Sequence, residues 1–279
     1  MKGRRWLFIT AGAVGGGILF LFFTVMFVSV RDLQGIAERF LARNGYSFRA
    51  AHFSTAFPLG IKAADLEISG ESGVLLKAKE LTVRLRLLPL VTGKVMFTSK
   101  AIIGVGHVRV DYSLRDGGIR IESTNVRLED IPFFQTVADA QVRGTMRLNG
   151  NFRWKGKDAG GELRLEVKGA NVSGVKLGGI ALPDADYSTI QGMFRGTGGM
   201  VKLESFTFQG DGLYVRLKGD FPQATPLGTS PLNLSLELMP KPEFLEKQKF
   251  VFLLLAKYLT TPGHYEIPIR GTLAKPLIQ

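Results

Sequence analysis

The chain contains no cysteine, so disulfide bonds, thiolate metal sites and cysteine nucleophiles are all excluded. Histidine is also scarce: His52, His107 and His264 are far apart in the sequence, and each lies in or beside a predicted strand. Such histidines are more often structural than catalytic or metal-binding. The sequence lacks Gly-x-Ser-x-Gly, phosphate-loop and His-Glu-x-x-His motifs. We therefore expect a protein that is not an enzyme and uses no cofactor or metal ion.

A partial calcium-loop pattern does not change this expectation. Asp184, Asp186 and Ser188 have the spacing that begins an EF-hand loop. The sixth position, which should be glycine, is Thr189, and the twelfth, which should be glutamate, is Arg195. The pattern therefore predicts no calcium site.

Basic residues outnumber acidic ones by 36 to 24, which gives a formal net charge of +12 at pH 7. They alternate with apolar residues along predicted strands instead of clustering, and no nucleic-acid-binding motif accompanies them. We therefore predict no nucleic-acid partner. A solvated basic surface accounts for the excess charge, and contact with anionic lipid headgroups is the alternative.

The single long apolar run of the sequence lies near the N-terminus, with no charged residue from Trp6 to Val30. At about 1.5 Å of helix per residue, the run exceeds the roughly 30 Å hydrocarbon core of a bilayer. Lys2, Arg4 and Arg5 precede it and Arg31 follows it, without a small-residue cleavage site. The positive-inside rule then places the N-terminus in the cytoplasm. We predict an uncleaved single-pass anchor, with the rest of the chain across the membrane.

The clearest β pattern begins the segment Lys79–Tyr112, where apolar and polar residues alternate strictly. A period of two indicates a strand with one apolar face and one solvated face. The same alternation recurs at 141–154 and 232–238. The apolar residues of these three segments form the candidate functional face: Leu81, Val83, Leu85, Leu87, Met146, Leu148, Phe152, Trp154, Leu232, Leu234, Leu236 and Leu238.

The rest of the sequence reads as strands joined by tight turns. Turn signals occur at Thr92-Gly93, Asp116–Gly118 and Gly210–Gly212. Between Leu203 and Phe206 the apolar parity slips, which predicts a one-residue β-bulge.

We predict a mainly β fold: an elongated, curved antiparallel sheet or incomplete barrel with a few short helices and one N-terminal transmembrane helix. Residues 1–31 would be the cytoplasmic N-terminus and anchor, and residues 32–279 the β-rich domain. Helices are expected at 32–44, at 129–140 and at 243–259, near the C-terminus. The apolar face has two interpretations: the core of a sandwich, covered by a second sheet, or a groove open to lipid.

Three blocks of the sequence resemble a known group of proteins. KELTVRLRLLPLVTGKV resembles the N-terminal block of AsmA-like proteins, with its alternating strand, Leu-Leu-Pro-Leu corner and glycine turn. GMVKLESFTFQGDGLYVRLKG resembles the recurring hairpin of that superfamily. PLNLSLELMPKPEFLEKQKFVFLLLAKYL, followed by HYEIPIRGTLAKPLI, is similar to the end of the type II secretion system protein N family.

The resemblance implies a bacterial inner-membrane protein whose main domain faces the periplasm. It also implies an elongated β structure with an apolar groove, since some superfamily relatives are implicated in moving phospholipid. None of the three blocks implies catalytic residues.

We therefore expect a non-catalytic component of the type II secretion system, anchored in the inner membrane and acting in assembly or tethering. The expected partners are the inner membrane and other secretion-system subunits. The alternative is a lipid-binding or lipid-transfer protein that carries phospholipid in an apolar β-groove between the inner and outer membranes.

Overall fold

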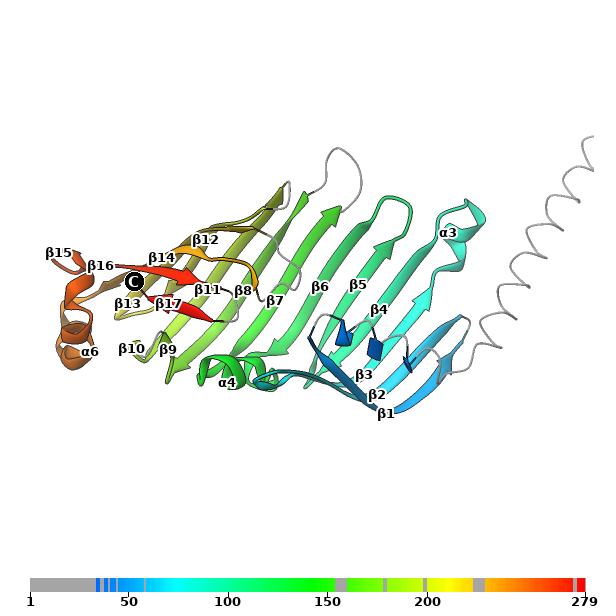
Figure 1. The fold of residues 1–279 in the computed structure, drawn as a ribbon, viewed down its shortest axis with the longest axis horizontal. Helices are drawn as coiled ribbons and strands as arrows, with labels where there is room; N and C mark the ends of the chain where they lie inside the picture. Colours follow the sequence, from blue (N-terminus) through cyan, green and yellow to red (C-terminus); the bar gives the residue numbers. More distant parts are fainter. Residues whose placement is uncertain are drawn as a thin grey trace, which may run out of the picture.

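The main feature of the fold is one long, open antiparallel sheet of fifteen strands (Figure 1). The computed structural model describes residues 34–35, 38–39, 41–43, 45–57, 59–153, 160–177, 180–197, 200–222, 229–272 and 275–278. From β1 to β8, neighbouring strands in the chain are also neighbours in the sheet. β8 then pairs with β11, and β11 to β14 again pair in chain order. β16 then pairs with β14, and β15 and β17 both pair with β16. The prediction of a mainly β protein built on a long antiparallel sheet is confirmed.

The strands have the following bounds: β1 Ser47–Ala56, β2 Gly60–Gly70, β3 Gly73–Leu85, β4 Met96–Ile103, β5 Gly106–Ser113, β6 Gly118–Arg127, β7 Gln141–Arg153, β8 Gly160–Ser173, β11 Ala185–Thr197, β12 Met200–Gln209, β13 Leu213–Pro222, β14 Asn233–Pro240, β15 Leu259–Thr261, β16 His264–Gly271 and β17 Pro276–Ile278. A separate hairpin consists of β9 Lys176–Leu177 and β10 Ile180–Ala181.

The predicted turns and bulge are present. Gly93 and Gly117 adopt φ values of 72° and 63°, a backbone region that residues with a Cβ rarely enter. In β12, Leu203 pairs with Gly219 and Phe206 with Leu217, so β12 has one residue more than β13 between these pairs. This is the β-bulge that the slip in apolar parity predicted.

The predicted membrane anchor and its flanking residues Lys2, Arg4, Arg5 and Arg31 lie outside the described residues. Of the helices that the structure does describe, none combines the length and the apolar character needed to cross a membrane. Within the predicted helix at 32–44, residues 34–35, 38–39 and 41–42 are described and are helical.

Short helices lie in the longer connections between strands. The 3-10 helix η1 (Leu128–Asp130) and α4 (Phe133–Ala138) join β6 to β7, as the prediction at 129–140 required. α4 contacts both β3 and β7, and the Thr136 hydroxyl donates a hydrogen bond to the Val74 carbonyl at 2.6 Å. The sheet is therefore curved enough for one short helix to reach strands that are four positions apart (Figure 1).

The strand predicted to include Leu87 ends earlier, at Leu85. Leu87 is instead the first residue of helix α3 (Leu87–Val91), which joins β3 to β4. Pro89 lies in the first turn of this helix, where its missing N–H removes no bond because first-turn amides have no intrahelical partner. The Thr92 backbone N–H and hydroxyl both donate to the Pro89 carbonyl, at 3.0 and 2.8 Å, and so close the helix.

The helix predicted over 243–259 is divided into α5 (Pro242–Lys247), α6 (Lys249–Leu254) and the 3-10 helix η3 (Ala256–Tyr258). The chain leaves helical geometry at Gln248, with φ −108° and ψ 26°. In one continuous helix Phe244 and Phe252 would be about 12 Å apart along the axis. The break brings their ring centroids to 6.3 Å, and Phe252 then packs on Tyr265. Burial of these aromatic rings is the physical reason for the division.

Candidate functional site

The pairing of the strands aligns their apolar residues in continuous rows across the sheet. In one row each residue pairs with the next: Ile61, Val83, Ser99, Val110, Ile121, Gly150, Leu163, Phe194, Leu203, Gly219, Leu234 and Ile269. The adjacent row on the same face consists of Ala63, Leu81, Ala101, Val108, Ser123, Leu148, Leu165, Gly192, Phe206, Leu217, Leu236 and Ile267. Every member of both rows is uncharged. We call the surface that these rows form the apolar face.

The exposure of the apolar face changes along the molecule. On β3, β5 and β6, the large side chains of Val83, Val110 and Ile121 are half-buried. On β14 and β16, Leu234 and Ile267 are buried and belong to the larger of two apolar clusters. The difference must come from what lies opposite each part of the face, because both parts have the same alternating sequence pattern.

The C-terminal part of the apolar face is covered because the sheet curls back on itself. β17, on the outer side of β16, contacts β9, the strand that directly follows β8 in the chain. Since β11 to β14 lie between β8 and β16 in the sheet, these strands must bend round a common interior. Phe252 of α6 and Leu255 are also buried there. This end of the face is therefore a closed core.

No second large sheet covers β3 to β6 in the described part of the chain. Apart from the main sheet, only the short β9–β10 hairpin forms a sheet there. α4 lies at one end of these strands, where it contacts β3 and β7 (Figure 1). At that end the smaller apolar cluster, which includes Ile103 and Val126, is buried, as is Ser123. The open region is the part of β3 to β6 around Val83, Val110 and Ile121, and the face is closed at β14 to β16.

The residues predicted from the sequence fall into these two regions. Leu81, Val83 and Leu85 lie on the apolar face of β3 and are half-buried. Met146, Leu148 and Phe152 lie on the same face of β7 and are also half-buried. Trp154 lies outside the described residues. The structure brings the β3 and β7 sets together on one continuous surface.

The residues predicted around β14 have a different environment. Leu234, Leu236 and Leu238 of β14 are all buried, as is Leu232, which immediately precedes the strand. They pack in the closed core and contribute no open surface. This part of the face is therefore covered, but by the curled strands of the same sheet and by α6, not by the second sheet of a sandwich.

Sequence reasoning left out several members of the open region. Val108 and Val110 of β5, and Ile119 and Ile121 of β6, belong to the same face as Val83 and are half-buried. The sequence shows the same period-two alternation at these four positions, although they are absent from the predicted candidate face.

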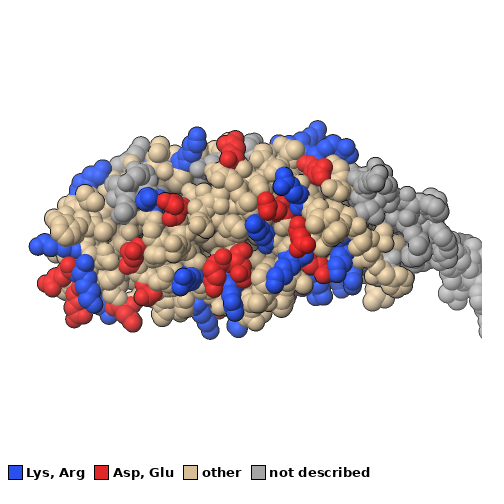
Figure 2. Space-filling model, turned by 90° about the horizontal axis from the view of Figure 1, so that it is seen from below, with Lys and Arg blue, Asp and Glu red and all other residues tan. Residues whose placement is uncertain are grey.

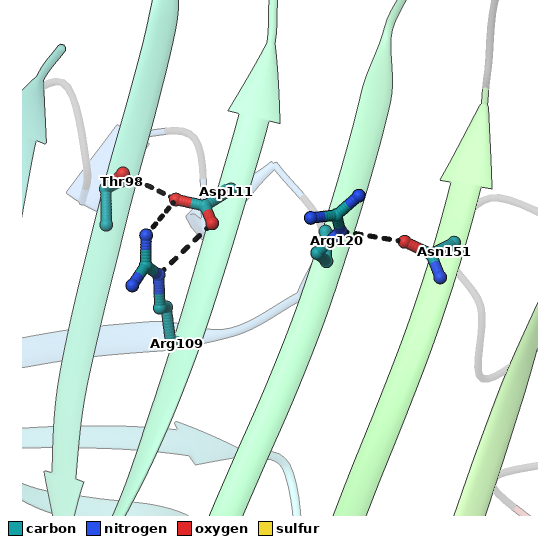
Figure 3. Close-up of polar contacts among 5 residues, drawn as sticks. All are labelled: Thr98, Arg109, Asp111, Arg120 and Asn151. Carbon is teal, nitrogen blue, oxygen red and sulfur yellow. Dashed lines mark hydrogen bonds and ion pairs between the residues drawn. The ribbon is translucent and has the colours of Figure 1, made fainter.

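The opposite face of the sheet is polar. Its rows continue from strand to strand through Arg84, Thr98, Asp111, Arg120, Asn151, Glu162 and Arg195. The Thr98 hydroxyl and the Arg109 guanidinium donate to the Asp111 carboxylate, and Arg120 Nε donates to Asn151 Oδ1 at 3.1 Å (Figure 3). The Thr98–Asp111 and Arg120–Asn151 bonds join neighbouring strands, whereas the Arg109–Asp111 bond lies within β5. All of them satisfy polar groups on the solvated side.

Two carboxylates on this face have lowered pKa values. Burial alone would raise the pKa of Asp111, but hydrogen bonds from Thr98 and Arg109 outweigh it and the pKa is lowered. The hydrogen bond from Lys62, at 2.6 Å, is the main reason that the pKa of Glu80 is lowered. Both groups are therefore stabilised as charged carboxylates. In this form they pair with neighbouring cations and carry no proton to donate.

Positive and negative side chains are interspersed on the surface seen in Figure 2, with no large field of one sign. Ion pairs among the described residues include Arg195 with Glu204 at 2.8 Å and Lys176 with Asp139 at 3.0 Å.

The described residues contain no group of three His, Asp or Glu side chains that could hold a metal ion. Asp184 and Asp186 have separate partners: Asp184 accepts from the Gly174 backbone N–H at 2.8 Å, and Asp186 from the Asn171 side-chain amide at 2.7 Å. The apolar face is therefore the main candidate surface for function. In comparisons with known proteins, no family model, no curated protein and no solved structure matched the chain.

Proposed function

We propose that this protein binds lipid acyl chains on the open part of its apolar face. The observation that carries the proposal is the half-buried surface of β3 to β6, on which each apolar residue pairs with another uncharged residue on the next strand. Apolar surface left in water costs about 25 cal/mol per Å², so a large uncovered face normally marks a binding site. An acyl chain matches this surface, because it has no hydrogen-bonding groups along its length.

The proposed role is lipid binding or transfer between the inner and outer membranes of a bacterium. It agrees with the resemblance of the sequence to the AsmA-like superfamily and the apolar groove that the resemblance implies. In this proposal β3 to β8 line the groove and the curled strands β14 to β17 form its closed end. Residues 1–31 anchor the protein in the inner membrane, and the β-rich domain lies in the periplasm.

Site-specific photo-crosslinking in cells tests lipid binding directly. A photoreactive phenylalanine analogue would replace Val83 or Val110 on the apolar face. Matched controls would carry it at Thr82 or Arg109, the preceding residues on the polar face of the same strands. We expect phospholipid adducts, detected by mass spectrometry, at Val83 and Val110 only. If neither apolar position yields a lipid adduct, the proposal is wrong.

A substitution adds a second measurement. Val110→Asp places a charge on the open apolar face, whereas Thr124→Asp places one at an exposed position of the neighbouring strand β6, opposite His107. We expect Val110→Asp to reduce the lipid adducts at Val83 several-fold, because an unpaired carboxylate disfavours an adjacent acyl chain. Thr124→Asp should leave them unchanged.

A role as a non-catalytic component of the type II secretion system is the second candidate. One structural observation favours it: within the described residues, β1 pairs only with β2, so its other edge offers backbone groups to a strand of another subunit. The resemblance of the C-terminal block points the same way. Deletion of the gene should then retain a type II substrate in the periplasm, and normal secretion by the deletion strain would contradict this role.

A further inference from the structure

Helix α6 has two apolar sides, and only one of them faces the protein. Phe252 and Leu255 are buried in the core, where Phe252 packs against Tyr265. Phe250, Leu253 and Leu254 are exposed by 84%, 59% and 66%. Their i, i+3, i+4 spacing places them on one side of the helix. We call these three residues the α6 patch.

Four lysines flank the α6 patch in the sequence. Lys241, Lys247, Lys249 and Lys257 are all exposed, and in the described part of the chain no ion pair joins any of them to a carboxylate. Glu243 and Glu246 are the acidic residues of the same segment, which leaves it with an excess of positive charge. Large apolar side chains bordered by lysines are the composition that favours a membrane interface with anionic lipids.

The position of the patch is consistent with this chemistry. α6 lies at one end of the long axis of the molecule, and β1 lies at the other (Figure 1). Leu259 of β15, close to α6 in the sequence, is exposed as well. The apolar surface is therefore presented at the tip of the molecule, remote from the N-terminal strands.

We propose that the α6 patch docks on the surface of an anionic membrane. Phe250, Leu253 and Leu254 enter the boundary between headgroups and acyl chains, and the lysines contact the anionic headgroups. The inference goes beyond the proposed lipid binding and does not require lipid on the apolar face.

Vesicle flotation tests the docking surface. The full chain would be carried in nanodiscs of neutral phosphatidylcholine, which shield the apolar run Trp6–Val30, and mixed with vesicles of phosphatidylcholine with or without phosphatidylglycerol. We expect the protein to float with the vesicles that contain phosphatidylglycerol. Replacing Phe250, Leu253 and Leu254 by serine should reduce flotation by roughly tenfold or more, because three large apolar side chains are lost from the contact.

Two control variants separate the contributions. Val105→Ser removes an apolar side chain of similar exposure, 62%, from the turn between β4 and β5 and should float like the wild type. Replacing Lys247, Lys249 and Lys257 by glutamine should abolish the preference for phosphatidylglycerol while preserving the fold, as judged by circular dichroism.

Either of two results would overturn the inference. One is flotation that the triple serine variant, folded like the wild type, retains in full. The other is no flotation of the wild type together with a dimer that the serine substitutions dissociate, which would make the patch a contact between two copies of the chain. Photo-crosslinking at Val83 and Val110 does not depend on the patch, so failure of docking is distinguishable from failure of lipid binding.

Discussion

Arg195 of β11 forms an ion pair with Glu204 of β12, with 2.8 Å between Nη1 and Oε1. Glu204 is the extra residue of the β12 bulge, lying between Leu203, which pairs with Phe194, and Ser205, which pairs with Met193. The bulge lets Leu203 and Phe206 both pack in the larger apolar cluster, although they are three residues apart. In a regular strand they would face opposite sides of the sheet.

This relationship predicts different effects for two changes at one position. Deleting Glu204 restores a regular strand and turns Phe206 and Phe208 towards the polar face, so we expect a loss of about 3 kcal/mol or more in the free energy of unfolding. Glu204→Ala removes only a partly exposed ion pair and should cost at most about 1 kcal/mol. Chemical denaturation followed by circular dichroism measures both, and equal losses would contradict the role given to the bulge.

The open and closed parts of the apolar face should respond differently to truncation. Leu238→Ala removes a side chain that is 2% exposed in the closed core, and we expect it to cost about 3 kcal/mol. Leu85→Ala, on the half-buried face of β3, should cost about 1 kcal/mol, because part of its surface already contacts water. Similar costs in denaturation experiments would show that β3 is covered as fully as β14.

Ser123 has a buried hydroxyl without a hydrogen-bond partner among the described residues. It lies on the apolar face between Val108 and Leu148. Since a buried, unsatisfied hydroxyl is unfavourable, Ser123→Ala should raise the free energy of unfolding by about 1 kcal/mol. Ser99→Ala, at a half-buried position of the same face, is the matched control and should be nearly neutral. A thermal shift assay would detect the difference, and destabilisation by Ser123→Ala would reveal a partner for the hydroxyl.

The lowered pKa of Asp111 predicts a pH-dependent contribution to stability. Its folded-state pKa lies below its unfolded value, so the contribution is present above the unfolded pKa of about 3.9 and is lost as the pH falls through the folded pKa. Thr98→Val removes one of the hydrogen bonds responsible and should cost about 1 kcal/mol at pH 7 but little at a pH below the folded pKa. Thr98→Ser retains the hydroxyl and serves as the control. Denaturation at several pH values would contradict the prediction if the cost were independent of pH.

The strands and turns were largely predictable because they depend on local signals. The alternation of Leu81, Val83 and Leu85 defined β3, and the Asp116–Gly118 turn separated β5 from β6. The bulge at Glu204 followed from a slip in the same alternation. Where a local rule competed with packing, the prediction was wrong: the burial of Phe244 and Phe252 divides the helix expected at 243–259.

The exposure of the candidate face could not be predicted from local pattern. Leu81, Val83 and Leu85 alternate in the same way as Leu234, Leu236 and Leu238, yet the first set is half-buried and the second is buried. The difference arises because the C-terminal strands curl until β17 reaches β9. That contact joins segments about 100 residues apart, and its geometry depends on the accumulated twist and bend of the strands between them.

Because consecutive strands from β1 to β8 are neighbours in the sheet, inserting or removing a hairpin would change the length of this molecule. Neighbouring strands lie about 4.8 Å apart, so one additional hairpin lengthens the sheet by about 10 Å. Because β1 to β8 pair in chain order, a hairpin inserted at Asp116–Gly118 can pair locally and leave the remaining pairings unchanged. The spacing between β1 and α6 is therefore adjustable in discrete steps, by evolution or by design, without altering the sequence at either end.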